Sequence, residues 1–373
     1  MSDVPHLRFP EFSGEWEKYT IGDLCEEFKS GKNIKAESIQ EEGVYPVFGG
    51  NGLRGYTDRY NHDGDYVLIG RQGALCGNVR FVTGKTYITE HAIAAKATND
   101  NYTRYLEYLF VRLNLGQFSD QSAQPGLAVN KLLKIETYVP SKAEQLKIAF
   151  LLRLLDERIA TQNKIIEKLQ SLIKGLSQQL LSSENDWILY RLDDLAQIKS
   201  GYSGTQVSYQ TPYKVSRIET ISKHCIDIQR IGYVECIPES YRLNVGNILF
   251  SNINSIQYIG NTAYLDKDYG LYHGMNLLRI IPNTTIVRPR FLHLLLCTDW
   301  AINHFQTICN KAVSQASINQ TALGKSRFPI PPMSVQQQIC SMFELTERKL
   351  DNEQEYISCL QQQKRYLLQK MFI

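Results

Sequence analysis

Two long stretches of the chain repeat apolar residues at alternating spacings of three and four, which is the heptad pattern of a coiled-coil helix. The first stretch follows Pro140 and is interrupted only at Gln162. Its apolar positions are Leu152, Leu155, Ile159, Ile166, Leu169, Ile173, Leu176 and Leu180. The second follows Pro331-Pro332 and is weaker; its seam reads Phe343, Thr346, Leu350, Glu353, Ile357, Leu360, Lys364, Leu367 and Met371. The pattern predicts one long helix after each proline site, where a missing backbone N–H is tolerated.

Each predicted helix has about 40 residues and a length of roughly 60 Å, whereas helices in globular proteins average about 11–12 residues. This length favours pairing of the two helices with each other, as an antiparallel coiled coil, over packing of each helix on its own domain. Gln162 and Glu353 fall at the same slot of the two seams, and a polar residue there helps to fix the register. The pair would then hold the globular parts at a set separation.

The rest of the chain has the pattern of short strands. Apolar runs such as Val44–Phe48 and Tyr66–Ile69 are separated by turn signals that include Gly49-Gly50 and Asn51-Gly52. The periodicity becomes helical around 102–113 and 290–305. These patterns predict α+β domains with a mostly antiparallel, strongly twisted sheet.

Short segments of the first half recur in the same order in the second half. Trp16–Leu24 (WEKYTIGDL) recurs as Trp187–Leu195 (WILYRLDDL). The other matches are Lys29-Ser30-Gly31 with Lys199-Ser200-Gly201, 64–69 with 246–251, Gly77-Asn78 with Gly260-Asn261, and His91 with His273. From 138 and 329 onward, the two halves align without a gap to the end of the chain. Chance accounts for any one match but not for their common order, so we interpret the chain as two copies of one unit.

The predicted fold class is therefore α+β, with two similar globular α+β domains joined by two long helices in an internal pseudo-twofold repeat. The predicted boundaries are a first globular domain at 1–140, a central helix at 141–185, a second globular domain at 186–330 and a C-terminal helix at 331–373.

Composition adds few constraints. The chain has 373 residues, of which 43% are hydrophobic and 21% are charged, values typical of globular proteins. No apolar run approaches the roughly 20 residues of a membrane span, and the N-terminus lacks the apolar core of a signal peptide, so we expect a cytoplasmic protein without a membrane partner. The 8 cysteines contain no C-x-x-C spacing, which favours reduced structural thiols over a metal or redox site. A net charge of +3 is a weak basic bias for a DNA-binding protein.

The sequence does not match the motifs of the common enzyme classes that we considered. Gly84-Lys85-Thr86 and Gly324-Lys325-Ser326 resemble the end of a phosphate-binding loop, but the first glycine of such a loop would fall at Val79 and Asn319. No Gly-x-Gly-x-x-Gly begins a helix, so the dinucleotide or S-adenosylmethionine type of Rossmann signal is missing. No catalytic residue and no metal ligand is predicted.

Polar loops of the globular parts offer groups that read DNA. Arginine recognises guanine edges, Asn and Gln recognise adenine edges, and Lys and Arg contact phosphates. The glycines between 49 and 55 would allow close approach of the backbone to another surface. Candidate DNA-binding residues are Lys32, Asn51, Arg54, Tyr56, Arg59, Arg71 and Gln72 in the first half, and Tyr202, Arg217, Asn252, Asn254 and Gln257 in the second. For each single residue, an ordinary surface loop remains the alternative.

The sequence resembles the specificity subunit of type I restriction–modification systems, the HsdS family, over essentially its whole length. The resemblance rests on Leu7–Trp16 (LRFPEFSGEW), on the Pro-x-x-x-x-Gln openings that end at Gln145 and Gln336, and on Leu367–Phe372 (LLQKMF). It also rests on the doubled architecture. The second opening departs from the family pattern, since Val335 stands where Glu144 precedes Gln145.

The resemblance implies two target-recognition domains that each read one half of a split DNA site, with the paired helices as a spacer. It further implies that the helices bind two modification subunits, which methylate adenine at N6 with S-adenosylmethionine, and that ATP-dependent restriction subunits join them. This chain would be non-catalytic and would bind no cofactor, and S-adenosylmethionine, ATP and Mg are expected on its partners. Spacer and partner-binding residues would be Gln145, Leu152, Leu155, Ile159, Ile166, Leu169, Gln336, Phe343, Leu350, Ile357 and Leu360. The alternatives are a methyltransferase or nuclease with unrecognised motifs, and a coiled-coil scaffold without DNA readout.

Overall fold

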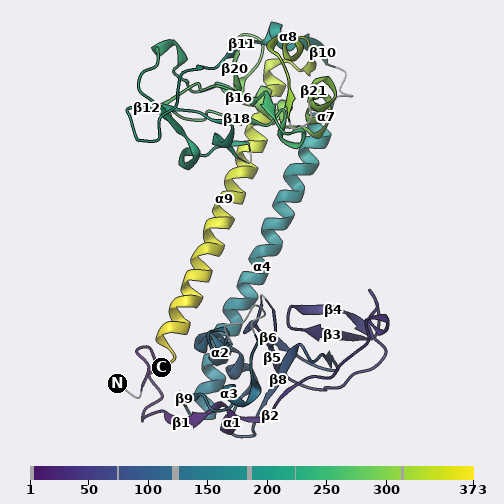
Figure 1. The fold of residues 1–373 in the computed structure, drawn as a ribbon, viewed down its shortest axis with the longest axis vertical. Helices are drawn as coiled ribbons and strands as arrows, with labels where there is room; N and C mark the ends of the chain where they lie inside the picture. The colour runs from purple at the N-terminus through teal and green to yellow at the C-terminus, as the bar shows by residue number, and fades with distance from the viewer. Residues whose placement is uncertain (1–3, 74, 120–125, 183–186, 223, 312–314) are drawn as a thin grey trace. The chain divides into compact units, whose positions relative to one another are not determined.

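The computed structural model of the chain describes residues 4–73, 75–119, 126–182, 187–222, 224–311 and 315–373. They form two compact units (Figure 1): unit 1 contains Met1–Lys164 and Gln354–Ile373, and unit 2 contains Ile165–Glu353. The boundary between the units therefore cuts both long helices. Each helix begins in one unit and ends in the other.

Unit 1 combines three sheets with short helices and the start of the first long helix. A four-stranded antiparallel sheet has the order β2 (Cys25–Ser30), β8 (Ala92–Ala97), β5 (Tyr66–Gly70), β6 (Val79–Val82). A three-stranded sheet has the order β4 (Gly52–Thr57), β3 (Tyr45–Gly49), β7 (Tyr87–Ile88), in which β3 and β7 are parallel. β1 (Glu17–Thr20) pairs with β9 (Glu136–Val139). The helices are α1 (Ile21–Leu24), α2 (Thr103–Leu113), α3 (Val129–Leu132) and α4 (Lys142–Leu180), with 3-10 turns η1 (Ala36–Ser38) and η2 (Leu115–Phe118).

Unit 2 repeats these three sheets in the same order. They are β11 (Ala196–Ser200), β20 (Leu277–Pro282), β16 (Ile248–Ser251), β18 (Thr262–Tyr264); then β15 (Gly232–Val234), β12 (Tyr213–Val215), β19 (Leu271–Tyr272); and β10 (Ile188–Arg191) with β23 (Arg327–Ile330). β12 and β19 are again parallel. Unit 2 adds the pair β13 (Ile221–Ser222) and β14 (Cys225–Ile226), and the sheet β17 (Ile253–Asn254), β22 (Ala316–Ser317), β21 (Asn310–Lys311). Its helices are α5 (Leu192–Leu195), α6 (Pro289–Leu296), α7 (Asp299–Ile308), α8 (Gln320–Gly324) and α9 (Met333–Lys370), with 3-10 turns η3 (Ile218–Thr220), η4 (Ile228–Arg230), η5 (Glu239–Tyr241) and η6 (Ile256–Tyr258).

The internal repeat and the α+β class are thus confirmed, with differences in detail. Gly77 and Gly260 both adopt positive φ, at 85° and 83°, and donate their N–H groups to the carbonyls of Gly70 and Ser251, the last residues of β5 and β16. The helical stretch around 290–305 forms two helices, because the Thr298 hydroxyl caps a new helix start by accepting from Ala301 N at 3.3 Å. His91 and His273 do not occupy matching positions, since His273 directly follows β19 whereas two residues separate Ile88 of β7 from His91.

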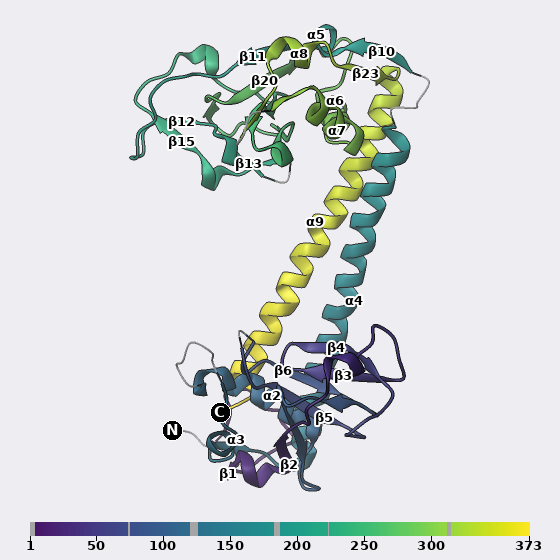
Figure 2. The same cartoon turned by 45° about the vertical axis from the view of Figure 1, so that its right-hand side comes forward.

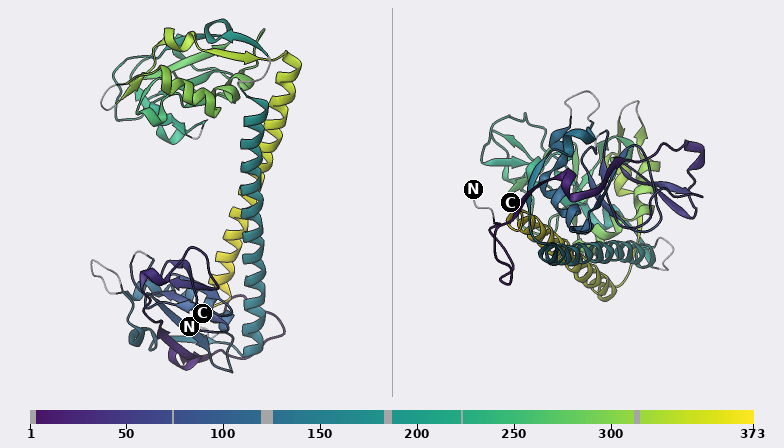
Figure 3. Two further views of the ribbon diagram at one scale, coloured as in Figure 1. Left: turned by 90° about the vertical axis from the view of Figure 1, so that its right-hand side faces the viewer. Right: turned by 90° about the horizontal axis from the view of Figure 1, so that it is seen from below.

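The core of unit 1 contains the C-terminal end of the chain. α2 packs against β5, β6 and β8 (Figure 2), and its buried side chains share one apolar cluster with the ends of both long helices. Phe372 stacks on Tyr105 of α2, with ring centroids 5.4 Å apart. Leu7 N donates to Lys370 O at 2.8 Å, so the start of the described chain lies against its end (Figure 3). The last turn of α9 is therefore a structural part of unit 1.

The core of unit 2 contains the end of α4 in the same way. Leu181 is fully buried in the main cluster, where Trp300 of α7 donates its indole N–H to the Leu181 carbonyl at 2.7 Å. In both units the far end of a long helix from the other repeat closes the core.

The two long helices pair in each unit as the heptad pattern predicts. In unit 1 the first half of α4 shares a cluster with the last half of α9, and in unit 2 the last half of α4 shares one with the first half of α9. The helices are thus antiparallel in both units. Every predicted seam position is buried or half-buried, whereas Leu172 and Leu345, which lie off the seam, are exposed. Gln162, the polar seam residue, is only 4% exposed.

Removing the ring that closes the core of unit 1 should unfold that unit selectively. We expect Phe372→Ala to lower the free energy of unfolding of unit 1 by about 3 kcal/mol, because a buried aromatic side chain is lost. Hydrogen exchange would show faster exchange of β5 amides in unit 1 and unchanged exchange of β16 amides in unit 2. Tyr366→Ala is the matched control, since that ring lies six residues earlier, in the last turns of α9, and is 55% exposed. Equal effects of the two substitutions would contradict this account of the core.

Candidate nucleic-acid interface

The candidate residues of unit 1 that lie closest together surround the turn between β3 and β4. Gly49 and Gly52 form the last pair of this antiparallel hairpin, and the exposed Asn51 lies between them in the turn. The Cδ atom of Arg54 lies 2.8 Å from the position that a β-carbon on Gly49 would occupy. Because Gly49 has no side chain, the aliphatic part of the Arg54 side chain can pack against its backbone.

The loop that follows β5 lies against the same turn. A β-carbon on Gly50 would be 2.8 Å from the His91 carbonyl oxygen, to which Arg71 N donates at 2.9 Å. Gln72 Oε1 lies 3.2 Å from His91 Nδ1. Arg71 and Gln72 also line a hollow of about 200 Å³ with 126–128. The structure thus brings together Asn51, Arg54, Arg71 and Gln72.

The remaining candidates of unit 1 lie farther along the hairpin and beside β7. Tyr56 exchanges backbone hydrogen bonds with Gln40, at 2.8 and 2.9 Å. Lys32 is exposed, and its backbone N–H donates to Ile88 O at 3.0 Å. The Arg59 guanidinium lies 5.8 Å from the centre of the Tyr87 ring. Tyr56 thus lies on the β4 edge of the sheet, whereas Lys32 and Arg59 lie beside β7 at its other edge.

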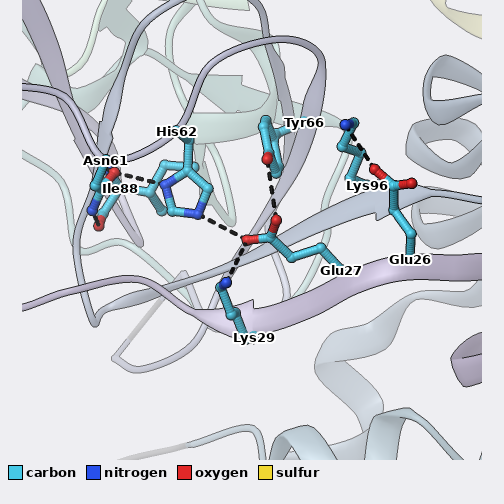
Figure 4. A network of polar contacts seen from close by, with 8 residues as sticks. All are labelled: Glu26, Glu27, Lys29, Asn61, His62, Tyr66, Ile88 and Lys96. Atoms are coloured by element: carbon cyan, nitrogen blue, oxygen red, sulfur yellow. Dashed lines mark hydrogen bonds and ion pairs between the residues drawn. The ribbon is translucent and has the colours of Figure 1, made fainter.

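A network of polar side chains lies beside β7 and contacts the backbone of Ile88 (Figure 4). The Glu27 carboxylate accepts from Tyr66 Oη and lies against His62 Nε2 and Lys29 Nζ, each at 3.1 Å. Asn61 binds both backbone polar groups of Ile88, next to the site where Lys32 is anchored. Burial raises the pKa of Glu27, but the hydrogen bonds from Lys29 and Tyr66 lower it, and the pKa is lowered overall. Burial raises the pKa of Tyr66 to about 12. Burial lowers the pKa of His62, although the nearby Glu27 carboxylate acts in the opposite direction.

In unit 2 the candidates divide into inward and outward groups. Asn252 Nδ2 donates to Ile318 O, just after β22, at 3.3 Å, and Asn254 donates to Ser251 Oγ in its own loop at 3.1 Å, so both amides bind groups of the chain itself. Gln257 and Arg217 are exposed, with Arg217 3.4 Å from Glu219. Tyr202 packs edge-on against Tyr241, with ring centroids 5.3 Å apart.

One polar residue of the turn was missed from sequence. Arg80 of β6 is exposed, and its Nη2 atom lies 3.0 Å from the position that a β-carbon on Gly52 would occupy. The available signal was a lone charge within the apolar run of Val79–Val82. Only the tertiary structure shows that this strand lies beside the β3–β4 turn.

Comparison with known proteins identifies the family. The model of the family described as "Type I restriction modification DNA specificity domain" matches residues 13–171 and again 184–362. The chain belongs to this family. The predicted resemblance and the predicted duplication are both confirmed.

Similar proteins carry the same family description. The chain is 41% identical over 154 residues to the type I restriction enzyme EcoprrI specificity subunit of Escherichia coli, and 38% identical over 193 residues to the putative MjaX specificity subunit of Methanocaldococcus jannaschii. These matches cover 40% and 50% of this chain, and 38% and 45% of the relatives, so each spans less than half of the relative's length. The S subunit of a type I restriction–modification system from M. genitalium has a similar fold, with a TM-score of 0.69 at 18% identity over 99% of both chains.

The two openings of the specificity-domain helices make equivalent contacts inside the chain. Gln145 is 1% exposed; its Oε1 accepts from Tyr102 N at 3.0 Å, and its Nε2 donates to Pro140 O at 3.0 Å. Gln336 is fully buried and makes the same pair of bonds to Arg288 N and Pro331 O, at 2.7 and 2.9 Å. Each glutamine thus ties the start of a long helix to the start of α2 or α6. Within the described chain their amides are occupied by backbone groups.

The departure of the second opening from the family pattern has a local reason. Glu144 is 1% exposed, and Arg8 donates to its two oxygens from Nε and Nη2 at 2.8 and 2.7 Å. Val335, at the matching place in unit 2, packs against the apolar cluster. A buried carboxylate needs its cationic partner, and valine needs none. The N-terminal segment that carries Arg8 thus accounts for Glu144.

No metal or membrane site adds to this picture. In the described part of the chain, no group of three or more His, Cys, Asp or Glu side chains has a metal-binding arrangement. None of the helices described there has the length and hydropathy that crossing a bilayer requires. All 8 cysteines are free thiols.

Breaking the buried ion pair from one side should be costly, whereas replacing both partners should be tolerated. We expect Arg8→Met to lower the free energy of unfolding by about 3 kcal/mol, because Glu144 would stay buried without a cation. Adding Glu144→Val, the residue found at Val335, should recover most of this loss. Urea denaturation of the two variants and the wild type measures both steps. A double variant that is less stable than Arg8→Met would refute this explanation.

The Glu27 network should make unit 1 sensitive to acid. A carboxylate whose pKa is lowered by folding stabilises the native state above its unfolded pKa of about 4.3, and this stabilisation is lost as pH falls through the folded pKa. We expect Glu27→Gln to lower the free energy of unfolding by about 1 kcal/mol at neutral pH, with a smaller difference from wild type below about pH 4. Glu26→Gln is the control, because Glu26 is more exposed and, among the described residues, its one ion pair is with Lys96. Urea titrations at several pH values test this, and a difference that grows on acidification would contradict it.

Proposed function

We propose that this chain is the DNA sequence-specificity subunit of a type I restriction–modification complex. Each unit reads one half of a bipartite DNA site. One observation carries the proposal: the family's DNA specificity domain is present twice on the same scaffold, while the polar residues of the matching loops differ. Two copies of one fold with different polar loops are suited to reading two different sequences.

We place all covalent chemistry on partner subunits. The Gly-x-Gly-x-x-Gly spelling of Gly50–Gly55 lies in the β3–β4 hairpin and begins no helix. With no complete phosphate-binding loop in the sequence either, a non-catalytic role is favoured over an unrecognised methyltransferase or nuclease. The proposed partners are two modification subunits that methylate adenine at N6 and restriction subunits driven by ATP. S-adenosylmethionine, ATP and Mg would bind to these partners.

The long helices are proposed to act as the spacer and to dock the modification subunits. Seam residues are occupied by contacts within the chain, so partners would use the outward faces of the helices. In unit 1 that face of α4 exposes Leu146, Phe150 and Leu154 at helical spacing. With Tyr102 and Arg104, the first two line a hollow of about 460 Å³. Exposed apolar residues grouped in this way are typical of protein–protein contacts.

Methylation mapping of the assembled complex tests the function. The chain is purified with its modification subunit, incubated with genomic DNA and S-adenosylmethionine, and the methylated adenines are sequenced. We expect one bipartite motif, and no methylation by the chain alone. Replacing residues 45–95 with those of a relative should change only one half of the motif, because this range contains the turn between β3 and β4.

Two outcomes would refute the proposal in different ways. Methyl transfer by the purified chain without a partner would favour the enzymatic alternative. Binding to duplex DNA without sequence preference, even with modification subunits present, would favour the scaffold alternative. A replacement of 45–95 that alters both half-sites would contradict the assignment of one half to each unit.

A further inference from the structure

Three arginines at the β3–β4 turn have no acidic partner in the part of the chain that the structure describes. Among the described residues, no carboxylate forms an ion pair with Arg54, Arg71 or Arg80, although all three surround Gly49–Gly52. Arginines elsewhere in the chain are commonly paired; examples are Arg104 with Glu107, Arg153 with Glu157, Arg191 with Asp193 and Arg242 with Asp268. Arginines placed around one turn without a counter-ion favour a ligand that is rich in hydrogen-bond acceptors.

Arg54 reaches this place through an irregularity of its strand. Val47 pairs with Gly55 and Phe48 pairs with Leu53, so Arg54 is the extra residue of a β-bulge. Bulges turn a side chain away from its regular direction and are frequent next to functional sites. Gly52 and Gly55 on either side adopt positive φ, at 103° and 142°. The hairpin backbone is thus shaped around this one arginine.

Unit 2 has none of the three arginines at the matching positions. In β15, Gly232 and Tyr233 pair with consecutive residues of β12, so no bulge residue corresponds to Arg54. The Arg71 carbonyl accepts from Leu127 N at 2.9 Å, and the Asn252 carbonyl accepts from Ile318 N at 2.8 Å, which matches Arg71 with Asn252.

Strand pairing gives the third correspondence. Leu68 of β5 pairs with Arg80, and Leu249 of β16, at the same distance before the strand end, pairs with Ala263. Ala263 is fully buried. Arg54 therefore has no counterpart in unit 2. Arg71 corresponds to Asn252, and Arg80 corresponds to Ala263.

The difference between the two units at these three positions favours base contacts over phosphate contacts for the arginines. The phosphate backbone is the same in both halves of a DNA site, so groups that only contact phosphates have no reason to differ between two copies of one scaffold. Base contacts must differ if the two half-sites differ. An arginine that reads a base edge forms two hydrogen bonds with O6 and N7 of guanine, which is the commonest specific contact in the major groove.

We propose that Arg54, Arg71 and Arg80 form a guanine-reading cluster that is specific to unit 1. The inference rests on the proposed function and deepens it, because it names the base and the residues that read it. The glycine turn between β3 and β4 lets the backbone come close to the groove floor, and a two-stranded hairpin fits the width of the major groove. Arg71→Gln and Arg80→Gln are the central variants, since both side chains leave the core intact when shortened.

The test maps methylation by the complex of each variant with the modification subunit. We expect discrimination at guanine positions of one half-site to fall roughly tenfold to a hundredfold, with the other half unchanged. Arg71→Lys and Arg80→Lys should behave like the Gln variants, because lysine retains the charge but lacks the planar fork. Arg112→Gln is the matched control; it removes an exposed arginine of unit 1 at the end of α2 and should leave the motif intact. Thermal melting of each variant shows that the fold is retained.

A chemically altered duplex gives an independent readout. Replacing the guanines of the unit 1 half-site with 7-deazaguanine removes the N7 acceptor and leaves the phosphates unchanged. Binding of the wild-type complex should weaken about tenfold, and binding of the complex that carries Arg71→Gln should change much less.

Three results would overturn the proposal or its basis. Lys variants with the wild-type motif, together with Gln variants that bind all sequences equally weakly and with a smaller salt dependence, would mean phosphate contacts. An unchanged motif in all variants would remove the cluster from recognition while the proposed function stands. A wild-type complex without any bipartite motif would overturn the proposed function itself, and the inference with it.

Discussion

The exchange of helix ends between the two units is the constraint on which the rest of the structure depends. Neither globular part buries its own apolar surface completely: unit 1 needs the ring of Phe372 against Tyr105, and unit 2 needs Leu181 below Trp300. Since each closing segment belongs to the helix of the other repeat, neither repeat contains all of its own core. The antiparallel pairing of α4 and α9 follows from this exchange, because each helix must run from one unit to the other.

The contacts retained in both copies are those that hold this framework. Gln145 and Gln336 occupy the same pair of backbone groups, and Gly77 and Gly260 make the same turn. Both glutamines are buried and their amides are occupied by the chain, so a substitution there would act on the junction of helix and domain. Conserved scaffold contacts of this kind leave the exposed loops free to differ. That freedom is what a reader of two unlike half-sites requires.

The two copies also differ where the chain itself is asymmetric. The N-terminal segment lies against the start of α4 and supplies Arg8 to the buried Glu144, whereas Val335 faces an apolar surface at the matching place. A buried carboxylate with a cationic partner and a valine against apolar side chains are both stable arrangements. The loops that face outward differ in another way, since a bulge places Arg54 against Gly49 in unit 1 and regular pairing leaves no such position in unit 2. The first difference concerns stability and the second concerns proposed recognition.

The sequence by itself determined the repeat, the two long helices and the face of each helix that is buried, because heptad spacing and segment order are properties of the chain. It also marked Asn51, Arg54, Arg71 and Gln72 as candidate DNA-binding residues, since polar residues with glycines at strand ends are a local pattern. Only the tertiary structure decided that Arg80 lies beside the same turn, that the Asn252 amide binds the backbone of Ile318, and that Phe372 completes the core of unit 1. Each of these depends on pairing between strands or helices far apart in sequence, and hydrophobic periodicity does not encode which distant segments will meet.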